Sequence, residues 1–309
     1  MKHSRRARRS RTQKKQLVPM LLGIALLVVT LLSIFLIFLK QPSKQQSDSK
    51  ASTVETTTTS SVITSESSEV QTEIIWEQQT EPIKLPILMY HAIHVMAPEE
   101  EANANLIVDP TTFESHLKAL QDAGYYTLSP EEAYKVLTEN VLPAGKKVVW
   151  LTFDDSLWDF YSYAYPLLKQ YQMKATNNVI TGFTEYGQAG HGHLTLDQIK
   201  EMQTAGLSFQ GHTVNHPDLE YSSIEDQTNE LTSSKAYLDS QLNQETIAIA
   251  YPGGRYSADT VALTEQAGYK LGVTTNNGLA SASDGLLTLN RVRILPTTTA
   301  EGLLSEISY

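Results

Sequence analysis

Short apolar runs alternate with segments of helical periodicity between residues 85 and 295. Strand-like runs such as "LPILMY", "KVVWLTF" and "TIAIAYP" are separated by helical patterns such as "TLDQIKEMQTAG", and the connections are short. Such alternation is typical of a parallel sheet covered by helices, and the number of repeats favours a closed barrel over an open sheet. No G-x-G-x-x-G follows the first run, so the fingerprint of a dinucleotide site is missing. We therefore predict an α/β fold, a (β/α) barrel, for residues 81–309.

Residues 17–39 read "LVPMLLGIALLVVTLLSIFLIFL", an apolar run without a charged side chain. As a helix this run would be about 34 Å long, which is enough to cross a bilayer. A cleaved signal peptide is the alternative, but the run is longer than the apolar region of such a peptide and no A-x-A-like site follows it. The basic residues 1–16 should stay in the cytoplasm. We therefore predict a single-pass protein of the cell membrane, anchored in the lipid bilayer, with residues 81–309 extracellular.

Residues 40–80 are rich in Ser, Thr, Gln and Glu and have too little periodic apolar content for a core. This composition is typical of a solvated, disordered tether. The apolar patch "EIIWEQ" around Trp76 is interpreted as a chance feature of this tether rather than as a docking segment. The predicted organisation is a basic tail, a transmembrane helix, a linker and one domain of usual size, in that order. The four ranges are 1–16, 17–39, 40–80 and 81–309.

The composition excludes several kinds of function. The chain has no cysteine, which rules out disulfides, thiol catalysis and thiolate metal ligands. Residues 1–16 hold eight of the 24 Lys and Arg and no acid, which leaves 16 basic against 34 acidic residues in the rest of the chain. A region this acidic lacks the clustered positive charge that nucleic acid binding requires. We expect a monomer without a nucleic acid partner.

Reactive side chains follow four of the predicted strands. They occur in "MYHAI", "LTFDD", "GHTVNHP" and "YPGGRY", each at the end of an apolar run. In a parallel barrel the carboxyl ends of all strands meet at one face, and the chemistry of such barrels lies there. The four groups should therefore surround one site.

His212 and His216 are four residues apart, a spacing that puts two imidazoles on the same face of a helical turn. Chance surface histidines are the alternative for this pattern taken alone. The adjacent Asp154 and Asp155 favour a metal site, because two imidazoles and one carboxylate bind a divalent cation and leave positions open. The charge of the cation would keep the second carboxylate ionised and free to accept a proton from water. Zn²⁺ is the first choice, and Co²⁺, Ni²⁺ and Fe²⁺ suit the same ligands.

"LTFDD", "HTVNHP" and "AYPGGRY", in this order, resemble the motifs of the NodB-type polysaccharide deacetylases, carbohydrate esterase family 4. The resemblance extends over residues 86–294. "MYH", "GYYTLSPEEA" and "LNRVRI" are most similar to the branch that acts on poly-N-acetylglucosamine and related exopolysaccharides. The resemblance implies a distorted (β/α) barrel and metal-dependent removal of acetyl groups from N-acetylated sugars.

The resemblance also implies roles for individual residues. Asp154 matches the catalytic base of the family, and Arg291 matches an arginine that could orient this base. Gly253 lies where the third motif supplies a backbone N–H to the oxyanion. The implied metal ligands are Asp155, His212 and His216.

The late histidine that usually protonates the leaving amine in this family is absent, since no histidine follows His216. His91 is the candidate for this role, because it closes a predicted strand and because the exopolysaccharide branch uses a histidine at this point. A histidine that merely packs beneath the site is the alternative. His94 and the "HGH" pair at 191–193 are set aside, and replacing His94 is expected to have little effect.

The chain departs from the family pattern at two further places. Ser156 follows "TFDD", where the family usually has glycine, and Asn177 and Asn178 stand where it usually has aromatic residues. The two amides could line a polar groove or loosen the barrel.

The combined hypothesis is metal-dependent hydrolysis of acetyl groups from an N-acetylglucosamine-containing polysaccharide of the cell surface or cell wall, with release of acetate. Two alternatives stay open. One is a catalytically weak or inactive glycan-binding protein of the same fold. The other is an iron(II) oxygenase, in which His216 and Asp218 would form a facial triad with a distant histidine.

Overall fold

The computed structural model describes residues 74–184 and 192–308, which belong to one compact unit, Val70–Tyr309. The predicted basic tail, the transmembrane helix and most of the linker lie outside the described residues, so these three assignments stay predictions. Within the described residues, no helix is long and apolar enough to cross a membrane.

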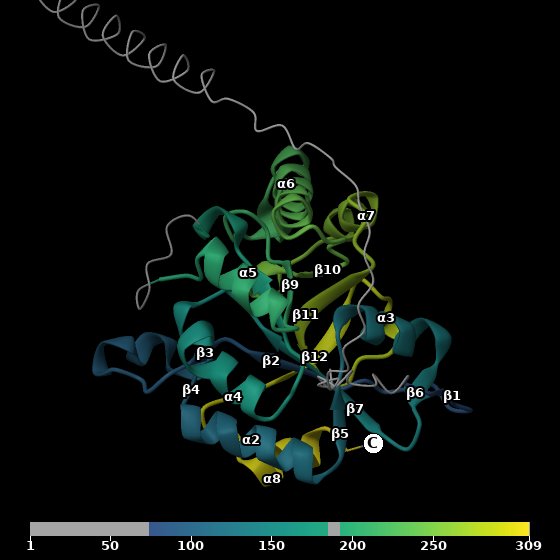
Figure 1. The fold of residues 1–309 in the computed structure, drawn as a ribbon. Coiled ribbons are helices and arrows are strands. Elements are labelled where there is room, and N and C mark those ends of the chain that lie inside the picture. The colour runs from purple at the N-terminus through teal and green to yellow at the C-terminus, as the bar shows by residue number, and fades with distance from the viewer. Residues whose placement is uncertain (1–73, 185–191, 309) are drawn as a thin grey trace, which may run out of the picture. The chain divides into compact units, whose positions relative to one another are not determined.

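In the described part of the chain, seven parallel strands form a closed barrel (Figure 1). The strands are β2 (Ile87–Tyr90), β7 (Lys147–Phe153), β8 (Thr176–Val179), β9 (Ser208–Gly211), β10 (Ala248–Ala250), β11 (Leu271–Asn277) and β12 (Leu289–Arg293). Their order around the barrel is β2-β12-β11-β10-β9-β8-β7, and pairing of β2 with β7 closes the ring. A further parallel strand, β5 (Tyr125–Thr127), pairs with β7. The predicted (β/α) barrel is therefore confirmed.

Helices cover the outside of the barrel (Figure 1). They are α2 (Pro110–Asp122), α3 (Pro130–Glu139), α4 (Tyr165–Gln170), α5 (Leu196–Thr204), α6 (Ile224–Leu242), α7 (Ala258–Gln266) and α8 (Ala300–Glu306). Local signals set their starts: the side chains of Asp109, Thr195 and Ser223 accept backbone N–H bonds at the beginnings of α2, α5 and α6. A π-helical segment, η2 (Phe160–Ala164), leads directly into α4.

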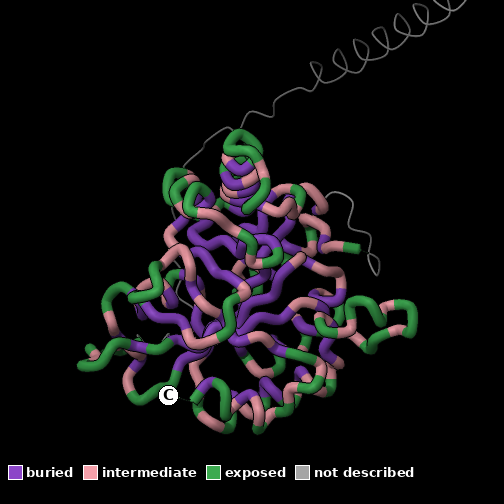
Figure 2. Tube along the Cα trace, turned by 180° about the vertical axis from the view of Figure 1, so that it is seen from behind, coloured by how far each residue is buried: buried purple, intermediate pink, exposed green. Residues whose placement is uncertain are grey.

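Alternate residues of each barrel strand face opposite sides, because side chains alternate along a strand. Ile87 and Trp150 belong to an apolar core inside the barrel, whereas their neighbours Leu88 and Leu151 belong to a second core under the helices. Figure 2 shows buried positions running through the middle of the molecule and exposed positions on its helix surfaces and loops. Large apolar side chains thus fill the inside of the barrel on the amino side of its strands.

The segment around Trp76 is part of the fold, which corrects its interpretation as a chance apolar patch. Strand β1 (Trp76–Gln78) pairs antiparallel with β6 (Val141–Pro143), and Trp76 packs against the inner core. Lys135 Nζ also lies 5.6 Å from the centre of the Trp76 ring. The sequence did not show this docking, because three residues are too few for a period and the partner strand follows a distant helix.

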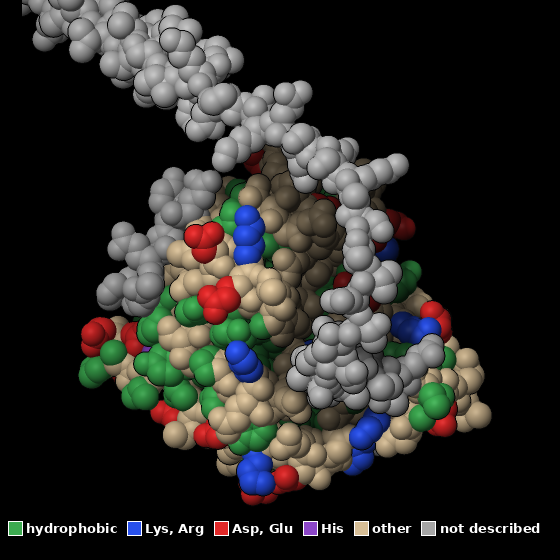
Figure 3. Space-filling model, viewed as in Figure 1, with side chains coloured by type: hydrophobic (Ala, Val, Ile, Leu, Met, Phe, Trp, Pro, Cys, Tyr) green, Lys and Arg blue, Asp and Glu red, His purple; other side chains and the backbone are tan. Residues whose placement is uncertain are grey.

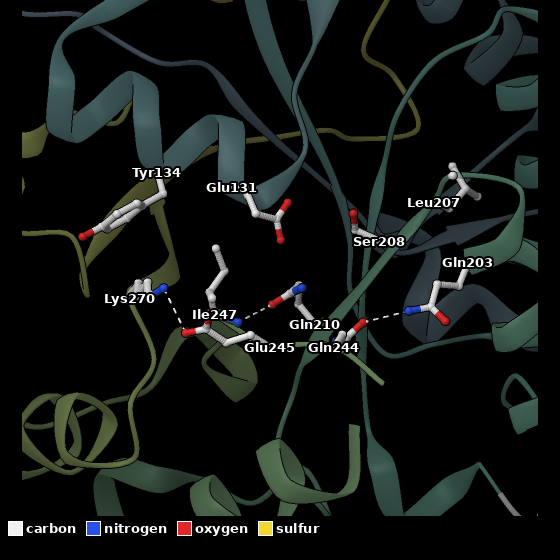
Figure 4. Close-up of a pocket in the computed structure, with 11 residues that line it drawn as sticks. Glu131, Tyr134, Gln203, Leu207, Ser208, Gln210, Gln244, Glu245, Ile247 and Lys270 are labelled. Carbon is white, nitrogen blue, oxygen red and sulfur yellow. Dashed lines mark hydrogen bonds and ion pairs between the residues drawn. The ribbon is translucent and has the colours of Figure 1, made fainter. Parts of the chain in front are cut away.

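A pocket lies near the amino ends of β9, β10 and β11 (Figure 4). Two polar contacts join residues that line it. Lys270 Nζ lies 2.9 Å from Glu245 Oε1, and Ile247 N donates to Gln210 Oε1 at 2.9 Å. The chemistry of parallel barrels lies at the carboxyl ends of the strands. This pocket is therefore at the wrong end of the barrel to be the predicted site.

Charged side chains are scattered over the face drawn in Figure 3, among polar and apolar ones. Some charges of the chain form i, i+4 pairs on helices, such as Lys118 with Asp122 and Lys135 with Glu139. Exposed pairs of this kind contribute little stability. The charges on this face do not indicate a ligand, and the functional residues are expected at the carboxyl end of the barrel.

Candidate active site

Every second residue from Trp150 to Asp154 points into the barrel, and the three side chains follow one another toward its carboxyl end. Trp150 belongs to the inner apolar core, Thr152 is buried beyond it, and Asp154 follows directly after the strand with 3% of its surface exposed. Inward side chains of a strand follow one another at intervals of about 6.6 Å. The run "WLTFD" therefore places an indole, a hydroxyl and a carboxylate at successive levels, with the carboxylate nearest the open end.

Asp154 is paired with Arg291, which β12 brings to the same level of the barrel. Arg291 Nη2 lies 2.6 Å from Asp154 Oδ2, and Nη1 lies 2.9 Å from Oδ1. The guanidinium is fully buried and also donates to the Thr274 carbonyl at 2.7 Å and to Thr152 Oγ1 at 3.2 Å. Burial alone would raise the pKa of Asp154, but the charge and hydrogen bonds of Arg291 hold it far below its usual range. Asp154 is therefore a fixed anion at neutral pH.

Asp155, His212 and His216 converge next to this pair. Asp155 Oδ1 lies 3.2 Å from His212 Nε2 and 3.4 Å from His216 Nε2, and one donor atom from each residue lies within 4.8 Å of the other two. Donors about 2.1 Å from a tetrahedral ion lie about 3.4 Å from one another. Two imidazole nitrogens and one carboxylate oxygen at this spacing fit a divalent cation of the Zn²⁺ type.

The ring of His212 is oriented by the backbone. Its Nδ1 lies 2.7 Å from the Ala250 carbonyl oxygen, to which it must donate a proton. In the neutral ring Nε2 then carries the lone pair and points at Asp155, as a metal ligand requires. Burial alone would lower the pKa of His212, but the hydrogen bond to Asp155 raises it above the ordinary value. A proton and a cation would thus compete for the same position.

The loop that carries both histidines is held by Glu230 of α6. Glu230 Oε2 accepts hydrogen bonds from the backbone N–H groups of Val214 at 2.7 Å and Asn215 at 2.9 Å. Glu230 Oε1 accepts a third bond from the Asn215 side chain at 2.7 Å. The sequence analysis missed this residue, because Glu230 is one of several acids on a largely polar helix and no local pattern marks it.

Backbone strain is concentrated in the two loops that carry the cluster. Of the seven non-glycine residues with positive φ in the described chain, four lie in these loops: Asp155 (72°), Ser156 (49°), Thr213 (65°) and His216 (56°). Such conformations cost about 1 kcal/mol or more each and gather at functional sites. Ser156 therefore adopts the conformation for which the family usually has glycine. Its buried Oγ accepts a hydrogen bond from Ile180 N at 3.3 Å, which accommodates this departure.

Gly253 lies in the turn η5 (Pro252–Gly254) after β10, with a φ of 59°. The hydrogen bonds of this turn are donated by Gly254 and Arg255, so they leave the Gly253 N–H unused. A Cβ on Gly253 would meet only the Arg255 side chain at 3.9 Å, whereas a Cβ on Gly254 would overlap with Thr275. Position 254 therefore requires glycine for steric reasons. Position 253 has space for a Cβ, and the Gly253 N–H is available to donate a hydrogen bond.

His91 follows β2 and lies within electrostatic range of both aspartates. Burial lowers the pKa of its ring, while the carboxylates of Asp154 and Asp155 act in the opposite direction. It is not a member of the three-residue cluster. The structure therefore brings His91 to the same end of the barrel as the predicted base and metal ligands, without making it a ligand.

His94 has structural partners. Its Nδ1 lies 2.6 Å from Oδ2 of the buried Asp159, and its Nε2 lies 3.1 Å from Glu100 Oε1. The pKa of His94 is raised above its ordinary value, mainly by the hydrogen bond to Asp159. Replacing His94 should therefore lower thermal stability, which modifies the expectation of little effect.

Two further histidines lie outside the cluster. His116 is buried in α2, between the Tyr90 hydroxyl at 3.0 Å and the Thr298 carbonyl at 2.8 Å. His193 Nδ1 lies 2.8 Å from the backbone carbonyl of Asp155, so it supports the ligand loop without offering an atom to the cluster. His191, the other member of "HGH", lies outside the described residues.

The two amides of β8 have opposite surroundings. Asn178 Nδ2 donates to Asp154 Oδ1 at 2.8 Å, inside the barrel. Asn177 is paired in register with Phe153 and Phe209 of the outer core, and its amide has no hydrogen-bond partner within the described residues. Asn178 therefore adds a polar group to the site, as one of the two expectations from the sequence had it. Asn177 instead leaves an unpaired amide in a core.

Taken together, these features define a (β/α)-barrel protein with a buried anionic aspartate and a candidate cation site at the carboxyl end of the strands. The model of the family described as polysaccharide deacetylase matches residues 141–272. The Bacillus subtilis (strain 168) protein YxkH, described as a polysaccharide deacetylase, is 38% identical over 223 residues, which are 72% of this chain and 75% of that protein.

The solved structure of the Streptococcus pyogenes deacetylase PplD in complex with acetate is similar, with a TM-score of 0.70 and 61% identity, covering 74% of this chain and 100% of that one. The Staphylococcus aureus (strain MSSA476) poly-β-1,6-N-acetyl-D-glucosamine N-deacetylase is 36% identical over 115 residues, which are 35% of this chain and 38% of that protein. The chain belongs to the polysaccharide deacetylase family, with a NodB-type domain.

Proposed function

We propose that this protein removes acetyl groups from N-acetylglucosamine units of a cell-surface or cell-wall polysaccharide and releases acetate. The observation that carries the proposal is the convergence of the anionic Asp154 with a separate three-donor cluster at one end of the barrel. Asp155, His212 and His216 would hold a divalent cation, with Zn²⁺ as the first candidate. A cation bound there supplies positive charge that polarises a carbonyl group and acidifies water.

The residues of the chain then have separate parts in the hydrolysis. Asp154 takes the proton of the water that attacks the acetamide carbon, and Arg291 keeps its carboxylate in one plane through two hydrogen bonds. The Gly253 N–H donates to the carbonyl oxygen as it becomes negative. His91 gives a proton to the nitrogen as the C–N bond breaks, so the products are acetate and a free amine.

The relatives support a glycan polymer as the substrate class. The Staphylococcus aureus relative is named for poly-β-1,6-N-acetyl-D-glucosamine, and PplD was solved with acetate, the small product of the reaction proposed here. Peptidoglycan, poly-N-acetylglucosamine and shorter N-acetylglucosamine oligomers are the three substrates to compare. Acetate release from each, measured with the same enzyme preparation, ranks them.

The iron oxygenase alternative requires Asp218 as a ligand beside His216. Asp218 Oδ2 instead lies 3.3 Å from Arg255 Nε, and the carboxylate that joins the histidines belongs to Asp155. This arrangement favours hydrolysis over the oxygenase reaction. The glycan-binding alternative retains the same fold, and turnover distinguishes it from an enzyme.

His91→Ala is expected to lower kcat on an N-acetylglucosamine oligomer by roughly 10²-fold or more, the usual scale for a lost general acid. Zn²⁺ binding, measured by calorimetry, should be unchanged, because His91 lies outside the cluster. The loss should be much smaller with an activated aryl acetate, whose leaving group needs no proton. His94→Ala is the control: we expect a lower melting temperature and a nearly normal kcat. An equal loss of kcat on both substrates would show that His91 is not the acid.

We further propose that residues 17–39 anchor the protein in the cell membrane with the catalytic domain outside. The uncharged apolar run and the basic residues 1–16 before it support this orientation. Protease added to intact cells should therefore cut within the linker and release a soluble domain that still liberates acetate. Full protection of the domain, with cleavage only after the cells are opened, would mean that the orientation is reversed.

A further inference from the structure

Asn178 carries a buried amide that has no role in the reaction proposed above. It lies on β8 with 1% of its surface exposed, and its Nδ2 donates to Asp154 Oδ1 at 2.8 Å. A side chain without a polar hydrogen, such as phenylalanine or leucine, could not donate this hydrogen bond. The contact therefore depends on the amide that this chain has there.

The hydrogen bonds that reach Asp154 are divided unequally between its two oxygens. Oδ1 accepts from Asn178 Nδ2 at 2.8 Å and from Arg291 Nη1 at 2.9 Å. Within the described residues, Oδ2 accepts from Arg291 Nη2 alone, at 2.6 Å. Each oxygen of a carboxylate has about two lone-pair positions. Oδ1 is therefore fully occupied, whereas Oδ2 keeps one open position.

We propose that Asn178 is a positioning residue that reserves Oδ2 of Asp154 as the oxygen that accepts the proton from water. The inference rests on the proposed function, in which Asp154 is the base. Arg291 cannot make this distinction alone, because a bidentate guanidinium gives one hydrogen bond to each oxygen. Asn178 Nδ2, the third donor, bonds to Oδ1 alone and so makes the two oxygens different. Without it Oδ1 would also have an open position, and water could bind there instead of at Oδ2.

Asn177 provides a matched control on the same strand. It is the same residue type and equally buried, but it faces Phe153 and Phe209 of the outer core instead of the site. Its amide has no partner within the described residues. Burial of an unpaired amide is unfavourable, so Asn177→Leu should keep or raise the melting temperature and leave kcat unchanged.

The test compares variants of the full-length chain by acetate release from a soluble N-acetylglucosamine oligomer and by calorimetric binding of Zn²⁺. Asn178→Leu has a similar volume but cannot donate a hydrogen bond. We expect its kcat to fall by roughly 10- to 100-fold, the scale of a lost hydrogen bond to a charged group, with KM and the Zn²⁺ Kd unchanged. Asn178→His can place a ring N–H near the position of the amide and should recover part of kcat. Asn178→Ala gives the same readout without added bulk if the leucine variant does not fold.

A loss of kcat in Asn178→Leu or Asn178→Ala, with normal turnover in Asn177→Leu and partial recovery in Asn178→His, supports the inference. Equal kcat values for the variants at 177 and 178 overturn it, as does a change confined to KM or to Zn²⁺ affinity. Absence of acetate release by the unchanged protein with Zn²⁺ bound overturns the proposed function, and this inference with it.

Discussion

Asp154→Asn is expected to lower kcat for acetate release by roughly 10²- to 10⁴-fold while Zn²⁺ still binds. An amide has nearly the shape of a carboxylate, but it cannot take a proton from water at neutral pH. The three cluster residues are unchanged in this variant, so its Zn²⁺ affinity should stay close to that of the unchanged protein. Acetate release and calorimetric titration with Zn²⁺, on the same preparation, measure both quantities.

The stability of the Asp154→Asn variant has to be measured alongside its activity. The substitution leaves the buried Arg291 without its anionic partner, and breaking a buried ion pair from one side typically costs about 3–5 kcal/mol. The melting temperature should therefore fall, and the assays belong well below it. Asp159→Asn is the matched control, because Asp159 is also a buried aspartate but is paired with His94. Near-normal turnover by Asp154→Asn would remove Asp154 from the mechanism.

Alanine at Asp155, His212 or His216 is expected to abolish Zn²⁺ binding and acetate release together. Each substitution reduces the cluster from three donors to two, and two donors hold a divalent cation far less tightly. Calorimetry with Zn²⁺ and the acetate assay should lose their signals in parallel for each variant.

His193→Ala is the control for these ligand variants. The His193 ring packs against Phe183 and contacts the backbone carbonyl of Asp155, but it gives no atom to the cluster, so this variant should retain Zn²⁺ binding. If all three ligand variants kept both Zn²⁺ binding and turnover, the cation site would have to lie elsewhere.

Strands and helices with a strong period could be predicted from the sequence. The run "KVVWLTF" is β7 without a residue of difference, and the helical pattern "TLDQIKEMQTAG" contains α5. The barrel followed from the number of such units. Helix α3 was not identified, although Ser129 and Glu132 form a capping box and Pro130 stands in its first turn. These signals mark only the first turn of a short helix of ten residues.

The site could be predicted only where its residues stand at the ends of strands. Asp154, Asp155 and His212 follow apolar runs, so topology brings them together whatever the exact register. Asn178 and Glu230 act across the barrel or from a covering helix, and their partners depend on strand register and helix orientation. A single sequence specifies neither of these, so the contact of Asn178 with Asp154 and the part of Glu230 became visible only in the structure.

We expect this barrel to be a cation-dependent enzyme that deacetylates N-acetylglucosamine polymers. The most direct measurement uses the compact unit, residues 70–309, stripped of metal by a chelator and supplied with poly-N-acetylglucosamine, peptidoglycan or N-acetylglucosamine oligomers. We predict no acetate before addition of Zn²⁺ and, after it, acetate together with an equal amount of free amine from at least one of the glycans. Acetate release that persists in excess chelator, or no release from any of the glycans while Zn²⁺ and the glycan both bind, would contradict the account.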